Sequence, residues 1–213
     1  MPIRLMILLL FIPLSSHAQF VGIEKSKFES HYRAQYDLFW SRATSVEMVL
    51  SYQGMDLEKD AIVDKAKEAG VNESIKIVEM LSAINTVMQD KSGQSVQVLS
   101  QYTAGPPSPI FLYNQLVESK PVILMVQSSR TSDRAVVVTG MEANVSDQGV
   151  VVSSLYVFDP YSYETVMTAN GWLPNQDKNL EYLEYSLING QKGLRLGDAG
   201  YITGVIMVDG TKM

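Results

Sequence analysis

The segment Gln35–Gly54, QYDLFWSRATSVEMVLSYQG, decides the architecture that we expect for this chain. After Ser41, small and apolar residues return at the spacing of one helical face, a pattern that predicts an α-helix. The residues of this stripe are Ala43, Val46, Val49 and Leu50, with Met48 and Tyr52 beside it. Gly54 follows at the place where helices are often stopped by a residue in the left-handed conformation. We therefore expect a helix over residues 41–53.

The polar residues around the start of this helix form the first candidate site. Ser41 and Arg42 would occupy its N-terminal end, and Gln35 precedes Ser41 by six positions. The first N–H groups of a helix have no partner within the helix and favour negative charge. Together with a side-chain amide nearby, these N–H groups make the start of the helix a suitable position for a nucleophile.

This segment resembles a block of the papain-like cysteine peptidases of the C39-like type. SRATSVEMVLSYQG aligns position for position with their CWAAS-x-x-MVL-x-Y-x-G block. The resemblance implies that Gln35 matches the oxyanion-hole Gln, that Ser41 replaces the nucleophilic Cys, and that Arg42 replaces the following Trp. A rival register that uses Trp40 as the family Trp would put Phe39 at the nucleophile. We reject it because it shortens the spacing to the Gln and breaks the rest of the match.

Three further stretches carry the resemblance into the second half of the chain. Lys120–Ile123, KPVI, matches the strand that precedes a turn in the family, and Asp133–Gly140, DRAVVVTG, matches the strand that the catalytic His opens. Arg134 stands where that His is expected. Tyr156–Tyr161, YVFDPY, matches the next strand, with Asp159 as the orienting carboxylate. The resemblance covers roughly residues 35–161.

The fold that we expect is α+β and papain-like, with an N-terminal helical half packed on a mostly antiparallel sheet. Helices first and strands second is an α+β order. The periodicities predict helices over 41–53, 59–69, 75–89 and 111–118, and strands over 95–100, 121–127, 135–141, 150–158 and 201–208. No pattern assigns the stretch between residues 161 and 200.

The N-terminus has the pattern of a secretory signal peptide. It reads MPIRLMILLLFIPLSSHA, with one Arg, an apolar run and a small-x-small site before Gln19. The apolar run is too short to span a membrane, and no later window is long and apolar enough. We expect cleavage near Ala18, export to the periplasm or the extracellular space, no integral membrane span, and a single domain over residues 19–213.

Composition excludes several classes of function. The formal net charge of −6 and pI ≈ 4.9 provide no basic surface for nucleic acid, so no nucleic-acid partner is expected. The chain has 0 Cys, which excludes disulfides, a thiolate nucleophile, zinc–thiolate sites and iron–sulfur clusters. No motif for a phosphate, metal or other cofactor is present, so no cofactor is expected.

The two replaced residues remove the chemistry of the family. Arginine stays protonated and cannot act as a general base, which the Cys–His mechanism requires. Only His17 and His31 exist, and His17 belongs to the signal peptide. His31 lies ten residues before Ser41, so it would reach the site only by chance. Peptidase chemistry by the family's mechanism is therefore not expected.

Two interpretations of Gln35, Ser41, Arg134 and Asp159 stay open. In the first, Arg134 and Asp159 form a structural ion pair, and Ser41 caps the helix or fills the space of the old thiol. In the second, the four residues hold the main chain or carboxylate of a bound peptide. The function we expect is an exported, catalytically inactive pseudopeptidase that binds a peptide or protein partner. The alternatives are a serine-dependent hydrolase or transferase using Ser41, and a structural component of an envelope or secretion assembly.

Overall fold

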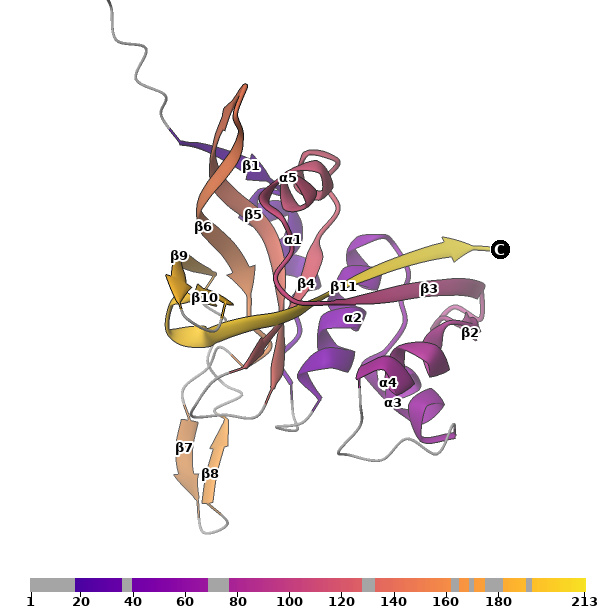
Figure 1. Cartoon of the computed structure of the whole chain (residues 1–213). Helices are drawn as coiled ribbons and strands as arrows, with labels where there is room; N and C mark the ends of the chain where they lie inside the picture. The colour runs from indigo at the N-terminus through magenta and orange to yellow at the C-terminus, as the bar shows by residue number, and fades with distance from the viewer. Residues whose placement is uncertain are drawn as a thin grey trace, which may run out of the picture.

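The computed structural model describes residues 18–35, 40–68, 77–127, 133–161, 165–168, 171–174, 182–190 and 193–213, and it is mostly β-sheet (Figure 1). Its described α-helices are short, and the longest has 12 residues. They are α1 Lys25–Phe28, α2 Ser41–Tyr52, α3 Lys59–Glu68, α4 Ile77–Ile84 and α5 Pro109–Val117. No helix among the described residues is long and apolar enough to cross a membrane. Of the expected signal peptide, residues 1–18, all but residue 18 lie outside these ranges, so the expectation stays a prediction.

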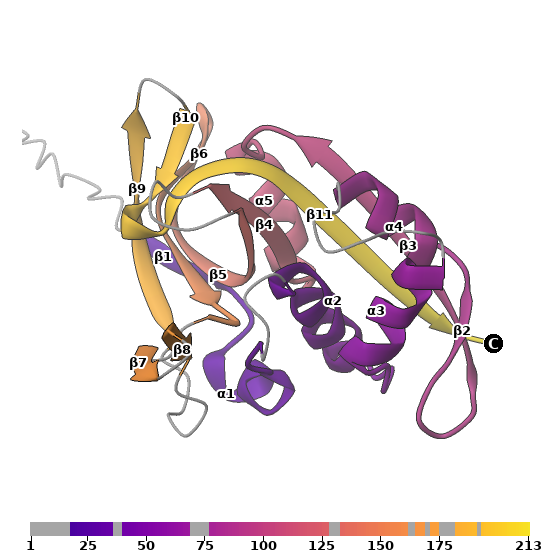
Figure 2. The ribbon, with the colours of Figure 1, turned by 90° about the horizontal axis from the view of Figure 1, so that it is seen from below.

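Six antiparallel strands close into a barrel. Around the ring, β4 pairs with β5, β5 with β6, β6 with β9, β9 with β10, β10 with β11, and β11 returns to β4. The strands are β4 Val122–Gln127, β5 Arg134–Ser146, β6 Gly149–Phe158, β9 Leu183–Gly190, β10 Gly193–Leu196 and β11 Gly200–Lys212. Figure 2 shows the curvature of β11 as it closes the ring.

Additional strands extend the barrel at two places. β1, Gln19–Gly22, pairs with β5, while β3, Ser95–Ala104, pairs with β11 and carries β2, Val87–Gln89, on its far side. β7, Thr165–Thr168, and β8, Gly171–Pro174, form a separate hairpin. The C-terminal half of β11 thus leaves the ring and becomes part of an open sheet with β3 and β2.

The expected papain-like α+β fold with a helical half on a sheet is therefore wrong. The structure is instead a closed six-stranded barrel with extra strands and only short helices among the described residues. β9 and β10 come from the stretch that the sequence pattern left unassigned. Without them the remaining strands form an open sheet, whereas with them every barrel strand has two neighbours and no exposed edge.

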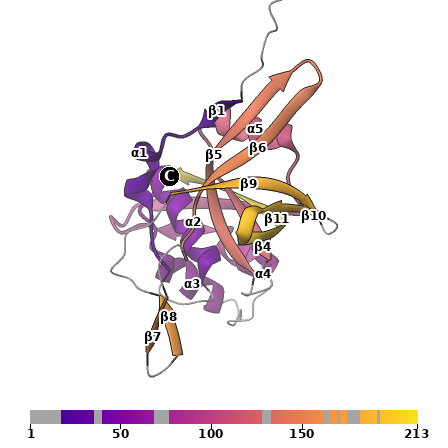
Figure 3. The ribbon, with the colours of Figure 1, turned by 90° about the vertical axis from the view of Figure 1, so that its left-hand side faces the viewer.

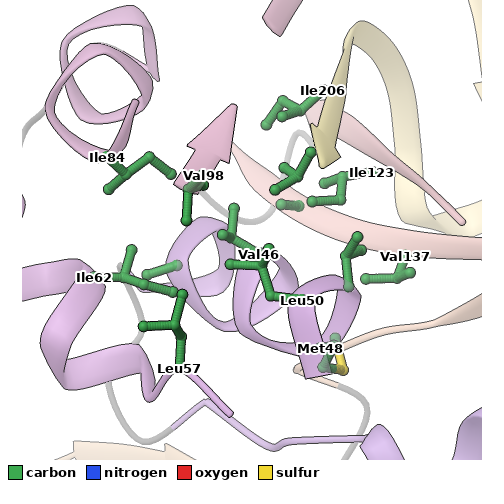
Figure 4. Packing of buried hydrophobic residues seen from close by; sticks show 14 of the residues in the cluster. Val46, Met48, Leu50, Leu57, Ile62, Ile84, Val98, Ile123, Val137 and Ile206 are labelled. Atoms are coloured by element: carbon green, nitrogen blue, oxygen red, sulfur yellow. The ribbon is translucent and has the colours of Figure 1, made fainter. Parts of the chain in front are cut away.

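Alternating side chains of the barrel strands supply two hydrophobic clusters. The first contains Val122, Leu124 and Val126 of β4 with residues of β5, β6, β10 and β11, and therefore fills the barrel interior, where α5 also packs. The second contains Ile123 and Met125 of β4 with α2, α3 and α4, and lies outside the barrel wall. In Figure 4, Val46 and Leu50 of α2 occupy the middle of this second cluster.

Two expected helices need smaller corrections, whereas α3 agrees with the expected helix over its described residues, Lys59–Glu68. α5 begins at Pro109, where Ser108 caps the helix by accepting a hydrogen bond from the N–H of Phe111, 3.3 Å. The expected helix over 75–89 is wrong beyond Ile84, because residues 87–89 form β2. Val87 pairs with Gln97 of β3 there, so tertiary pairing overrides the helical pattern. Residues 69–76 lie outside the described ranges.

Helix α2 forms as expected. It covers Ser41–Tyr52, and Gly54 has φ +84, the left-handed conformation that the sequence predicted. At its C-terminal end, the Gln53 side chain donates to the carbonyl of Val208, 2.8 Å, and accepts from the N–H of Gly210, 2.9 Å. These bonds fix the end of α2 to β11.

Candidate functional site

The site lies where the N-terminus of α2 meets the start of β5. Trp40 is the N-cap residue, and its carbonyl accepts hydrogen bonds from the N–H and the hydroxyl of Thr44, both 3.0 Å. Ser41 is the first residue of the helix, which agrees with the register that places it at the nucleophile position. Its Oγ accepts a hydrogen bond from the N–H of Ala135, 3.0 Å. Ser41 therefore joins α2 to β5 rather than capping its own helix.

Arg134 and Asp159 form an ion pair beside this junction. Nη1 of Arg134 lies 3.1 Å from Oδ2 of Asp159, and their side chains are 17% and 2% exposed. Arg134 begins β5, and Asp159 directly follows β6, the neighbouring strand. The other carboxylate oxygen of Asp159 accepts from the N–H of Tyr161, 2.9 Å. Burial raises the pKa of Asp159, while Arg134 and the Tyr161 N–H act in the opposite direction.

Gln35 reaches the same place from the N-terminal segment. Its backbone N–H donates to the carbonyl of Pro160, 3.0 Å, the residue after Asp159. Its side chain is buried, with only 2% of the residue exposed. The structure thus brings together all four residues that the sequence singled out, although three of them are almost completely inaccessible to solvent.

Tyr32 also belongs to this site, although no sequence pattern marked it. Its hydroxyl is buried and has no hydrogen-bond partner among the described residues. Burial, and secondarily the charge of Asp159, raise the pKa of Tyr32. A single Tyr in a polar segment has no motif or spacing that would mark it, so only the fold shows that it approaches the carboxylate.

Arg42, which the resemblance aligns with the family's Trp, is half-buried. Burial lowers its pKa, and the negative charge of Asp133 counteracts this. Asp133 is exposed and directly precedes Arg134, the first residue of β5. The positive charge of Arg42 and the negative charge of Asp133 therefore lie near each other.

His31 does not reach the site. Its Nδ1 lies 2.9 Å from Oγ of Ser51, near the C-terminus of α2. Ser51 follows Ser41 by ten residues, which corresponds to roughly 15 Å along a helix. Burial and, to a lesser degree, Arg33 lower the pKa of His31. Because a general base must lie within hydrogen-bond distance of the group it deprotonates, His31 cannot serve Ser41 in this structure.

The arrangement connects structural elements but shows no catalytic pair. Among the described residues, Ser41 has no hydrogen bond to a carboxylate or an imidazole, and no group of His, Asp and Glu suited to a metal ion is present. Arg134 remains cationic and already contacts Asp159. What the geometry provides is a set of polar links from α2 and the N-terminal segment to β5 and β6.

Comparison with known protein families supports the resemblance found in the sequence. Residues 28–190 match the model of the Peptidase_C39 like family. This range is more than half of the chain and includes Gln35, Ser41, Arg134 and Asp159. A search among curated proteins found no match.

Proposed function

The chain belongs to the Peptidase_C39 like family, and we propose that it is an exported, non-hydrolytic member that binds a peptide or protein partner. The observation that carries the proposal is the ion pair between Arg134 and Asp159 at the place where the family's His and its orienting carboxylate are expected. A guanidinium in this position satisfies the buried carboxylate but cannot accept a proton.

The state of Ser41 supports the loss of hydrolysis. A serine nucleophile needs a neighbouring base to remove its proton. The hydroxyl oxygen instead accepts a hydrogen bond from the N–H of Ala135, and only 2% of the residue is exposed. A substrate carbonyl would have to displace this contact and open the junction between α2 and β5.

We infer that the four residues now act as a structural bracket. Each connects a different segment: Gln35 the N-terminal segment, Ser41 the start of α2, Arg134 the start of β5, and Asp159 the end of β6. Their burial disfavours direct contact with a peptide, the other role that the sequence left open. Partner binding then uses another part of the surface.

The absence of hydrolysis is tested with the full chain. We expect neither cleavage of a peptide library nor labelling by a serine-directed fluorophosphonate probe, for wild type and for Ser41→Ala alike. An active serine hydrolase of known concentration serves as the positive control. Labelling of wild type that Ser41→Ala abolishes would overturn the proposal and establish the serine-dependent alternative.

Export and the role of Arg134 need separate measurements. Mass spectrometry of the protein recovered from the producing cell is expected to give a mature N-terminus at Gln19. Partners captured from the cell envelope are then titrated against wild type and Arg134→Ala. The bracket predicts a less stable variant whose folded fraction binds with unchanged affinity. A loss of affinity of about 1.5–3 kcal/mol, typical of a hydrogen bond to a charged group, would assign Arg134 to the binding site.

A further inference from the structure

Aromatic and acidic side chains gather on β1, β5, β6 and β9, together with Glu24, which follows β1, and Tyr182, which directly precedes β9. The aromatic members are Phe20, Tyr156 and Tyr182, and the acidic members are Glu24, Glu142 and Glu184; we call these six residues the aromatic–acidic surface. Strand pairing places four of them together, because Phe20 is opposite Glu142 and Tyr156 is opposite Glu184. Figure 3 shows these four strands side by side.

The rings form a continuous row. Phe20 meets Tyr156 edge to face with ring centroids 5.4 Å apart, and Tyr156 stacks on Tyr182 at 5.5 Å. All three rings are half-buried, so part of each stays accessible. Gly140 makes the row possible, because a Cβ there would lie 2.5 Å from the Phe20 ring.

The carboxylates surround the two tyrosines. Glu142 accepts a hydrogen bond from the Tyr156 hydroxyl, 3.1 Å. Burial, this hydrogen bond and the charges of Glu142 and Glu184 together raise the pKa of Tyr156 to about 12. At the other end of the row, burial raises the pKa of Tyr182, and Glu24 adds to the shift.

Within the part of the chain that the structure describes, none of the three carboxylates forms an ion pair with a basic side chain. Ion pairs among the described residues involve other acids, for example Glu47 and Asp159. Glu24 and Glu184 are exposed and Glu142 is half-buried. The surface thus combines accessible aromatic rings, which attract cations, with three carboxylates that form no ion pair with another described residue.

We propose that the aromatic–acidic surface is where the partner docks, through a segment rich in Lys or Arg. Lys and Arg side chains fit both features, because the aliphatic part packs on a ring while the charge meets a carboxylate. An acidic or a purely apolar segment would leave the three carboxylates unpaired. The inference rests on the proposed function only for the existence of a protein partner.

The test uses the full chain and a fluorescein-labelled (Lys-Ala)₅ peptide, followed by fluorescence anisotropy. We expect saturable binding that weakens as salt rises, and none to (Glu-Ala)₅. The variant Glu24→Gln/Glu184→Gln should weaken binding roughly two- to thirtyfold, the range for two exposed ion pairs. Tyr156→Leu keeps apolar bulk but removes the aromatic ring, and should weaken binding roughly two- to fivefold.

The matched control is Asp64→Asn/Glu79→Gln, which removes the same charge from exposed positions on α3 and α4. Its affinity should stay within about twofold of wild type, because distant charges are screened. Circular dichroism and thermal melting verify that every variant is folded. Equal losses in the two double variants would overturn the proposal, since only net charge would then matter.

Two further outcomes separate this proposal from the proposed function. If spermine displaces the labelled peptide at a lower concentration than unlabelled (Lys-Ala)₅ does, the surface binds polyamines. That result would refute the proposal that a protein segment docks there. Fluorophosphonate labelling of Ser41 would refute the non-hydrolytic function, yet it would leave the peptide titration and its variants unaffected.

Discussion

Replacing Ser41 by Ala tests whether this residue now holds the structure together. The hydroxyl of Ser41 accepts the hydrogen bond from the N–H of Ala135 in a place where Ser41 is only 2% exposed. Its removal leaves a buried N–H without a partner, and such a loss costs about 1–3 kcal/mol. We therefore expect the free energy of unfolding to fall by that amount.

The same helix offers a closely matched control. Ser45 is 0% exposed, and no described residue forms a hydrogen bond with its hydroxyl. Ser45→Ala thus makes the same chemical change at equal burial without breaking a hydrogen bond. It should leave stability unchanged or increase it, because alanine is the better helix former by about 0.5 kcal/mol.

Urea unfolding of wild type, Ser41→Ala and Ser45→Ala measures the difference. For a chain of this size, about 1 kcal/mol corresponds to roughly 2–4 °C in Tm, so thermal melting gives an independent value. Ser41→Cys is a useful third variant, because a thiol fills the space but is a weak acceptor. Equal midpoints for Ser41→Ala and Ser45→Ala would refute the bracket.

Three other substitutions have defined outcomes. Burial lowers the pKa of His31 in the folded protein, so wild-type stability should fall as pH decreases through and below the unfolded pKa of 6.5. His31→Gln should remove this pH dependence, which thermal melts from pH 7.5 to 5 measure. Burial raises the pKa of Asp159 above 3.8, so wild type should lose stability relative to Asp159→Asn as pH rises through the raised pKa. If urea unfolding gives the same difference in the free energy of unfolding across that pH range, the pKa shift is contradicted. Gly140→Ala should cost about 1–3 kcal/mol by overpacking against the Phe20 ring, and should cost clearly less in a Phe20→Ala background.

Local sequence patterns predicted those elements whose conformation depends mainly on local interactions. The apolar spacing after Ser41 and the glycine at residue 54 gave α2 with its correct start, because both ends of this helix carry their own signals. The pattern failed at Val87, since a three-residue strand is too short to show a period of two. Pairing with Gln97 decides its conformation, and that partner is remote from any helical signal.

The barrel could not be predicted because β9 and β10, the strands that close it, show no pattern of apolar and polar residues clear enough to assign. β9 and β10 bond to each other and to β6 and β11, so their role is defined only by strands far along the chain. The order of the three motifs did identify which site residues meet. It did not reveal that these residues are buried, because their burial depends on how α2 packs against the wall of the barrel. It also did not reveal that Ser41 accepts a hydrogen bond from the backbone N–H of Ala135.

The position of β11 has a consequence for how the protein folds. This last strand pairs with β10, β4 and β3, and Gln53 reaches Val208 and Gly210 across 155 and 157 residues of chain. Contacts of such high sequence separation close large loops and slow folding. Until β11 is in place, the edges of β4 and β10 are open and the end of α2 is unattached. The barrel should therefore stay unclosed in a newly made chain until β11 is available to pair with β10 and β4.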